Sequence, residues 1–291
     1  MADGYYSGGS PVVQIIANPD AGSSSQRRLR ALQRAFTSAG ARTILSESHS
    51  GEVRIDPDAQ HVCVVGGDGT LRHVAAAVYR SGLPVTLSLY PMGTVNLIAR
   101  ERGYSRDPAT FVARILGGTH RRDHYVAMIG DIILSGVASV GPDSYAVANL
   151  SLPLKRLFGR AAYVLAFFTV LAHWRRPGLE VTTAEGVIAC EAIYIAKGRY
   201  FAGPWSFAPR ASVEHRLLHG VALRHARRID FARFVWRLWR GRDLGRDPNL
   251  VLFSCDRLSI AGNASPLQAD GDIVANTPLT IAVRAEPFSF A

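Results

Sequence analysis

The chain has 291 residues, enough for about two domains of roughly 150 residues each. It carries 33 basic and 23 acidic side chains, a formal charge of +10, and only Lys155 and Lys197 are lysines. This arginine excess favours an anionic partner: a nucleotide, a nucleic acid or an acidic membrane face. The few scattered cysteines exclude a disulfide framework, and the absence of Walker-type, GxGxxG and HExxH motifs excludes those sites.

The first part of the chain alternates strand-like and helix-like segments. Such alternation is typical of a parallel sheet with helices on its faces. The predicted strands are Val12–Ala17, Arg42–Ser46, His61–Val65 and Val85–Tyr90, and the predicted helices are Gln26–Ala39, Thr70–Arg80, Thr94–Arg102 and Pro108–Leu116.

The pattern changes after Gly117-Gly118, where short β-like runs are separated by Gly, Pro and Asn. We therefore expect an α/β domain over residues 11–122 and a β-rich, mainly antiparallel domain over residues 123–291, with helical insertions at Leu152–Arg176 and Asp230–Arg240. The predicted strands of this second domain are Tyr125–Met128, Ile132–Leu134, Ile188–Ile195, Gly220–Leu223, Val251–Phe253 and Leu279–Val283.

A glycine turn, Gly66-Gly67-Asp68-Gly69-Thr70, follows the strand at 61–65 and precedes a helix. Glycines let the backbone approach a phosphate, and a helix N-terminus presents free N–H groups to it. Thr70 suits the N-cap position. The Asp68 carboxylate would repel a polyphosphate unless it holds Mg²⁺ or takes a proton. An ordinary Asp-Gly turn is the alternative.

Two further polar turns follow predicted strands: residues 91–96 after the fourth strand and residues 18–25 after the first. The carboxyl ends of parallel strands meet at one edge of a sheet, where ligands of open α/β folds bind. The three turns together therefore predict a phosphate-binding edge.

The motifs NPxxG, GGDGT and PxGTxN, in this order, resemble those of the diacylglycerol kinase catalytic-domain family of lipid kinases, which has sphingosine and ceramide kinases as relatives and is more distantly similar to NAD kinases. Segments 154–163, 201–211 and 268–279 resemble later family motifs. The resemblance implies an NAD-kinase-like α/β domain plus a C-terminal β-rich sandwich domain, ATP and Mg²⁺ as cofactors, and phosphorylation of a lipid hydroxyl, with ATP between the domains.

The resemblance also implies roles for individual residues. Asp272 would be the catalytic base, Asp270 is a neighbouring candidate, and a plain hairpin turn is the alternative for residues 270–272. Asp68 would help to place Mg²⁺, and Asp143 resembles an acid that sphingosine kinases use near the substrate hydroxyl. The implied nucleotide contacts are Asn18, Ser48, Gly66, Gly67, Asp68, Gly69, Thr70, Gly93, Thr94 and Asn96.

One loop departs from the family pattern. The family usually has APxAxxDDGxLD, a loop that holds a structural Mg²⁺, whereas this chain has Glu214-His215-Arg216 in place of DDG. Glu214 remains the candidate metal ligand, although Mg²⁺ prefers several oxygen ligands. A zinc cluster of Glu214, His215 and His219 is an alternative, and a surface loop is favoured over it. A second departure is Leu97, which replaces the Asp of GTxND.

Segment 230–240 separates aromatic and apolar residues from arginines around a helix, which suits an anionic bilayer surface or a helix packed on the sheet. The longest apolar run, 161–174, is too short to span a bilayer. We expect a cytoplasmic, peripherally membrane-associated protein whose partner is a lipid substrate at an anionic membrane surface. No RNA-binding signature accompanies the arginines, so no nucleic-acid partner is expected; a homodimer is left open.

These observations predict an ATP-dependent lipid kinase that acts on a lipid such as diacylglycerol. The alternatives are a sphingoid-base or ceramide kinase, an NAD kinase, and a nucleotide-binding regulator that has lost turnover, which the altered loop at His215 and Arg216 motivates.

Overall fold

The computed structural model describes residues 10–17, 23–48, 53–93, 95–118, 121–149, 167 and 169–291. It divides the chain into two compact units. The first runs to His124 and also contains Glu286–Ala291, and the second is Tyr125–Ala285.

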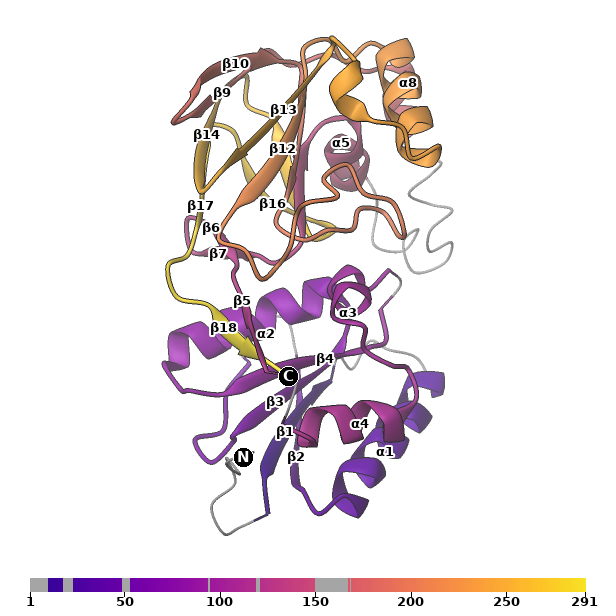
Figure 1. Cartoon of the computed structure of the whole chain (residues 1–291), viewed down its shortest axis with the longest axis vertical. Helices are drawn as coiled ribbons and strands as arrows, with labels where there is room; N and C mark the ends of the chain where they lie inside the picture. The colour runs from indigo at the N-terminus through magenta and orange to yellow at the C-terminus, as the bar shows by residue number, and fades with distance from the viewer. Residues whose placement is uncertain are drawn as a thin grey trace. The chain divides into compact units, whose positions relative to one another are not determined.

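The first unit is a sheet with helices on both faces, as the alternation of segments predicts (Figure 1). Its described strands lie in the order β2-β1-β3-β4-β18-β5, and all neighbours are parallel except β18 and β5. Helices α1 and α4 pack against each other. The elements are β1 Val12–Ala17, α1 Ser23–Ser38, β2 Arg42–Glu47, β3 His61–Gly66, α2 Asp68–Ser81, β4 Thr86–Pro91, α3 Leu97–Arg102, α4 Pro108–Leu116, β5 Arg122–His124 and β18 Phe288–Phe290.

The last strand corrects the expected division of the chain, which placed every residue after 122 in the second domain. β18 pairs with β4 and β5, and the Tyr104 hydroxyl donates a hydrogen bond to the carbonyl of Ala291. Phe288 and Phe290 alternate with a serine and are both buried, so the sheet of the first unit takes up this apolar segment.

The second unit contains two antiparallel sheets, as expected for a β-rich sandwich. Side chains of both sheets form one core, with Val181, Ile260 and Ile281 from one sheet and Ile193 and Leu267 from the other. The first sheet has the order β10-β9-β14-β17-β6-β7, namely Gly186–Cys190, Leu179–Thr183, Arg257–Gly262, Leu279–Val283, Ala127–Ile129 and Ile132–Leu134; the second has β13-β12-β11-β8-β15-β16, namely Leu250–Cys255, Leu218–Leu223, Ala192–Ala196, Val137–Val140, Pro266–Ala269 and Asp272–Asn276.

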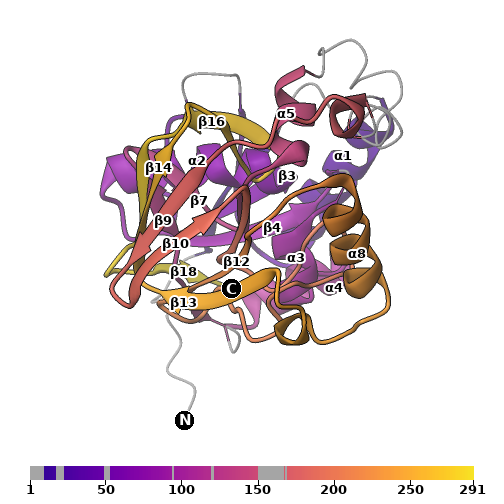
Figure 2. The ribbon, with the colours of Figure 1, turned by 90° about the horizontal axis from the view of Figure 1, so that it is seen from above.

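The predicted strand 188–195 is in fact two strands, β10 and β11, which belong to different sheets. The break falls at Glu191, whose carboxylate accepts a hydrogen bond from the backbone N–H of Ala226. The unit also contains α5 (Pro142–Asn149), α8 (Arg228–Trp239) and the 3₁₀ turn η1 (Leu244–Arg246). Figure 2 shows α8 at the margin of this unit. The predicted insertion 152–176 lies mostly outside the described residues.

Candidate phosphate site and carboxylate cluster

Two of the predicted glycine turns touch each other at the carboxyl edge of the first sheet. The carbonyl of Gly66 accepts hydrogen bonds from the N–H groups of Met92 and Gly93, at 2.9 and 3.0 Å. A Cβ added to Gly93 would lie 2.5 Å from the Cα of Gly67, so the two backbones can approach this closely only because both residues are glycine. The prediction that these turns share one edge is confirmed for this pair; residues 18–22 lie outside the described chain.

The helix after the first turn begins two residues earlier than predicted. α2 starts at Asp68, and its N-cap is Gly67 rather than Thr70, which lies within the first helical turn. The Thr70 side chain packs against Gly66, where an added Cβ would lie 2.6 Å from its Oγ1. The first N–H groups of a helix have no acceptor within the helix, so this turn and the start of α2 together form the type of site that binds a phosphate.

Asp68 joins α2 to α3. Its two carboxylate oxygens accept hydrogen bonds from the backbone N–H groups of Leu97, at 2.8 Å, and Ile98, at 3.0 Å, the first two residues of α3. Burial raises the pKa of Asp68, and these two hydrogen bonds partly offset that rise. Because a carboxylate has about four acceptor positions, Asp68 can still coordinate a cation while it holds α3.

Asn96 presents an unsatisfied acceptor beside the same turns. Its backbone is in the left-handed region, at φ 55°, which asparagine tolerates. Its Nδ2 donates to the carbonyl of Gly93 at 2.7 Å, while its Oδ1 is buried and has no hydrogen-bond partner among the described residues. A buried orphan acceptor is costly, so a ligand hydroxyl or amine that donates to it would bind favourably.

The structure describes only some of the remaining residues that are predicted to bind the nucleotide. Ser48 follows β2, and its N–H donates to the carbonyl of Ala17 at 2.8 Å, at the end of β1. It therefore lies at the same sheet edge as the glycine turns. Gly69 is in the first turn of α2. Asn18 and Thr94 lie outside the described residues.

Asp270 is a structural carboxylate of the second unit. Residues 269 and 272 pair across β15 and β16, and both Asp270 and Gly271 have positive φ, so residues 270–272 are a hairpin turn, as the alternative interpretation proposed. The Asp270 oxygens accept hydrogen bonds from three consecutive N–H groups, those of residues 135, 136 and 137, at 2.9, 2.8 and 3.1 Å. This bonding leaves Asp272, the half-buried first residue of β16, as the better candidate base.

Asp143 is connected to that hairpin by a chain of hydrogen bonds. Its carboxylate accepts from the hydroxyls of Ser139, at 2.5 Å, and Tyr194, at 3.0 Å. Ser139 in turn accepts from Nε2 of Gln268 at 2.9 Å, and Oε1 of Gln268 accepts from the N–H of Gly271 at 3.1 Å. Burial raises the pKa of Asp143, partly offset by the two hydroxyl donors. Sequence reasoning missed Ser139 and Tyr194 because no motif marks them.

The loop with Glu214 does not assemble a metal site from side chains. Glu214 is half-buried, its N–H bonds the Ser212 hydroxyl at 3.1 Å, and His215 is exposed. Among the residues that the structure describes, no group of three His, Cys, Asp or Glu side chains is placed to hold a metal. The zinc alternative therefore gains no support.

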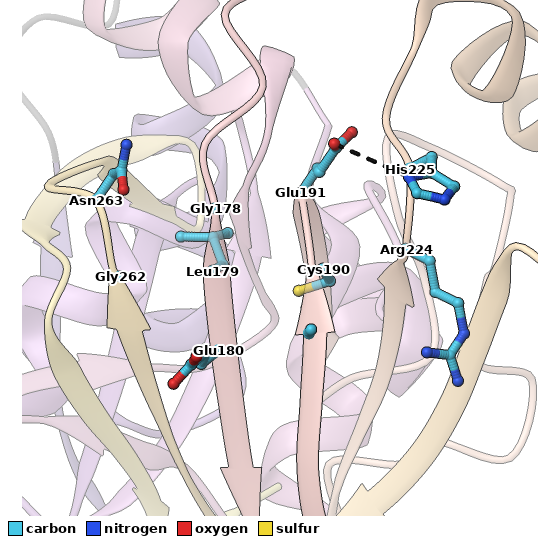
Figure 3. A pocket seen from close by; sticks show the side chains of 10 residues that line it. Gly178, Leu179, Glu180, Cys190, Glu191, Arg224, His225, Gly262 and Asn263 are labelled. Atoms are coloured by element: carbon cyan, nitrogen blue, oxygen red, sulfur yellow. Dashed lines mark ion pairs between the residues drawn. The ribbon is translucent and has the colours of Figure 1, made fainter.

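A hollow of about 600 Å³ in the second unit lies elsewhere (Figure 3). Glu191 points toward His225 there, with 3.9 Å between Oε1 and Nδ1, and also pairs with Arg176 at 3.5 Å. None of the predicted site residues lines this hollow, so it is not part of the candidate site.

Comparisons with known proteins find similar domains in both parts of the chain. Residues 12–128 match the model of the diacylglycerol kinase catalytic domain, and residues 136–290 match the YegS C-terminal NAD kinase beta sandwich-like domain. The second match covers more than half of the chain, so the chain belongs to the family with the YegS C-terminal NAD kinase beta sandwich-like domain, while residues 12–128 are similar to the diacylglycerol kinase catalytic domain.

Relatives within this family include "Probable lipid kinase YegS-like" proteins. The one from Pseudomonas aeruginosa (strain UCBPP-PA14) is 35% identical over 53% of this chain and 51% of its own length, and the one from Pseudomonas putida is 30% identical over 54% of each. The chain thus spans about half the length of the curated relatives it matches. A crystal structure described as a diacylglycerol kinase from Bacillus anthracis strain Sterne superposes with a TM-score of 0.72, at 18% identity and 96% coverage of both chains, which shows a common fold.

Proposed function

We propose that the protein is an ATP-dependent lipid kinase that phosphorylates the hydroxyl of a lipid such as diacylglycerol. The observation that carries the proposal is the pair of touching glycine turns at the carboxyl edge of the first sheet, within the residues that match the diacylglycerol kinase catalytic domain. The orphan Oδ1 of Asn96 beside them is the acceptor that a bound nucleotide would satisfy.

In the proposed reaction, backbone N–H groups of the Gly66–Thr70 turn bind nucleotide phosphates. Asp272 takes the proton of the lipid hydroxyl. The hydroxyl oxygen attacks the γ-phosphorus of ATP, and the bond between that phosphorus and ADP breaks. Mg²⁺ at Asp68 would neutralise charge on the phosphates. Asp143 acts through its hydrogen-bond chain by way of Ser139 and Gln268 to the hairpin that carries Asp272.

The test is phosphate transfer from labelled ATP to vesicles that contain diacylglycerol, a sphingoid base or ceramide, with and without Mg²⁺. Asp272→Asn should abolish product. Asp131→Asn, which alters an exposed carboxylate in another turn of the same unit, should leave it unchanged. Full turnover by the Asp272 variant would refute the assignment of Asp272 as the catalytic base.

The same panel distinguishes the alternative functions. Product only from a sphingoid base or ceramide would identify that kinase class, and product from added NAD would identify an NAD kinase. Tight ATP binding without product from any acceptor would indicate a nucleotide-binding regulator instead.

We further propose that α8 carries the lipid-surface contact. Phe231, Phe234 and Leu238 are buried, and the two phenylalanines contact Tyr194 of β11, so one face of the helix packs on the sheet as the alternative interpretation proposed. The outer face exposes Trp236 and Trp239, at 48% and 62% of their surface. Val235, which follows the buried Phe234, is exposed as well.

Exposed tryptophans beside arginines suit an anionic bilayer, where the rings enter the interface and the cations approach lipid phosphates. No helix in the described part of the chain is long and apolar enough to cross a membrane. The double substitution of Trp236 and Trp239 by alanine should reduce cosedimentation with anionic vesicles several-fold. Tyr79→Ala, an exposed aromatic of α2, should not; equal binding by the tryptophan variant would refute this contact.

A further inference from the structure

Lys197 is a buried cation inside the second unit. It follows β11, and its side chain has 0% exposure. The ammonium donates hydrogen bonds to two backbone carbonyls, that of Ser212 at 2.9 Å and that of His215 at 2.7 Å. A buried charge is tolerated only where polar groups surround it, so these carbonyls and the ammonium stabilise each other.

Both carbonyls belong to the loop that departs from the family pattern. Its turn is closed by a hydrogen bond from the N–H of His215 to the Ser212 carbonyl, at 3.1 Å, and by the bond from Glu214 N–H to the Ser212 hydroxyl. In addition, the Val213 carbonyl accepts from the N–H of Tyr125 at 2.8 Å. The loop therefore has a defined conformation in which backbone oxygens converge on a cation.

The residues present do not fit a divalent ion in this loop. Mg²⁺ and Ca²⁺ need several oxygen ligands, usually including carboxylates. The expected Asp-Asp-Gly segment is Glu214-His215-Arg216, which keeps one acid and adds a cationic arginine. Among the described side chains no metal-binding group of three forms, and the ammonium of Lys197 already binds two of the loop carbonyls.

We propose that the ammonium of Lys197 replaces the divalent cation expected in this loop, so that the loop is held by a cation of the chain itself and needs no metal. The covalently attached ammonium thereby takes the structural role of an ion that would otherwise have to be bound from solution. The proposal concerns this loop alone and does not apply to Mg²⁺ that a nucleotide would bring to Asp68.

The same residue links the loop to the hairpin that carries Asp272. The backbone N–H groups of Lys197 and Gly198 both donate to the Gly136 carbonyl, at 2.7 and 3.0 Å. The N–H of Gly136 donates to the Asp270 carboxylate at 2.8 Å. Lys197 therefore joins two parts of the unit: its side chain holds the loop, while its backbone is joined through Gly136 to the Asp270 turn.

Limited trypsin digestion tests the proposal, because Arg210 and Arg216 of the loop are exposed. The rate of cleavage after each residue reports how often the loop opens. For the wild-type protein without nucleotide, we expect the same rate in Mg²⁺ and in EDTA, and substoichiometric divalent metal by mass spectrometry after dialysis.

Lys197→Met keeps a similar length and removes the charge. It should speed cleavage roughly tenfold or more, which corresponds to the loss of charge-assisted hydrogen bonds, and Mg²⁺ should not restore protection. Arg199→Met removes an exposed positive charge two residues away and should leave the rate unchanged.

Three results would overturn the proposal: stoichiometric metal that stays bound in Asp68→Asn, slower wild-type cleavage of the loop in Mg²⁺, or unchanged cleavage of Lys197→Met. If the Lys197 variant does not fold, the metal content of Asp68→Asn and the wild-type Mg²⁺ response decide alone. None of these readouts requires lipid phosphorylation, so the proposal can fail or stand independently of the proposed kinase activity.

Discussion

Gly93→Ala places a methyl group where the two glycine turns touch. The new Cβ would lie 2.5 Å from the Cα of Gly67 and 2.7 Å from Oδ1 of Asn96. Carbon atoms in contact normally stand about 3.5–4.0 Å apart, so the turns must separate by about 1 Å. They cannot separate freely, because Gly66 bonds both Met92 and Gly93.

Overpacking of this kind costs about 1–3 kcal/mol. For a domain of 150–250 residues, each kcal/mol lowers Tm by about 2–4 °C, so we expect a fall of about 4–8 °C for a cost near the middle of that range. Nucleotide affinity should fall as well, since the N–H groups of the turn are displaced.

Scanning calorimetry and ATP titration measure the two effects, and a graded series controls them. Gly67→Ala should be milder, because its Cβ would lie 3.2 Å from the Cα of Gly93. Gly178→Ala should be nearly neutral, since nothing lies within 4 Å of its Cβ. A Gly93 variant that matches the Gly178 variant in both Tm and ATP affinity would refute the close contact between the turns.

In Asp270→Asn the asparagine tolerates the positive φ, but its NH₂ group faces N–H donors. Urea unfolding should show a free energy of unfolding that is lower by about 1.5–3 kcal/mol. An unchanged midpoint would contradict the structural role of Asp270. Burial, with a smaller effect of Arg121, lowers the pKa of His61 from 6.5 to about 3. The imidazole binds a proton more readily in the unfolded chain, so the free energy of unfolding should fall as the pH is lowered from 6.5 to 3, by at most about 5 kcal/mol. In urea titrations at several pH values, His61→Gln should flatten this dependence. Gln268→Leu breaks the chain from Gly271 to Ser139 and should lower kcat about tenfold with KM for ATP unchanged; an unaltered kcat would exclude that chain from catalysis.

The structural features that depend on residues close in sequence were predictable. The alternation of strands and helices, the Gly66–Thr70 turn and the hairpin at 270–272 each depend on dihedral preferences and on side-chain spacing over a few residues. The meeting of the turns after β3 and β4 was also predictable, because parallel neighbours end at the same edge.

Partners far apart in sequence were not predictable. Asp270 binds N–H groups 133 to 135 positions away, and the Tyr104 hydroxyl reaches the carbonyl of Ala291, 187 positions away. Lys197 was conspicuous as one of two lysines, yet its sequence neighbours do not reveal the carbonyls it binds.

The amino-acid sequence alone thus determined the alternating strands and helices of the first unit and the glycine turns between them, because those features arise from local backbone geometry and side-chain spacing. Only the tertiary structure decided that β18 returns to the first sheet, that residue 191 divides two strands, and which buried carboxylate or ammonium meets which backbone group. Burial removes water as a partner, so each such group must bind whatever the folded chain brings to it, and that depends on the path of the whole chain.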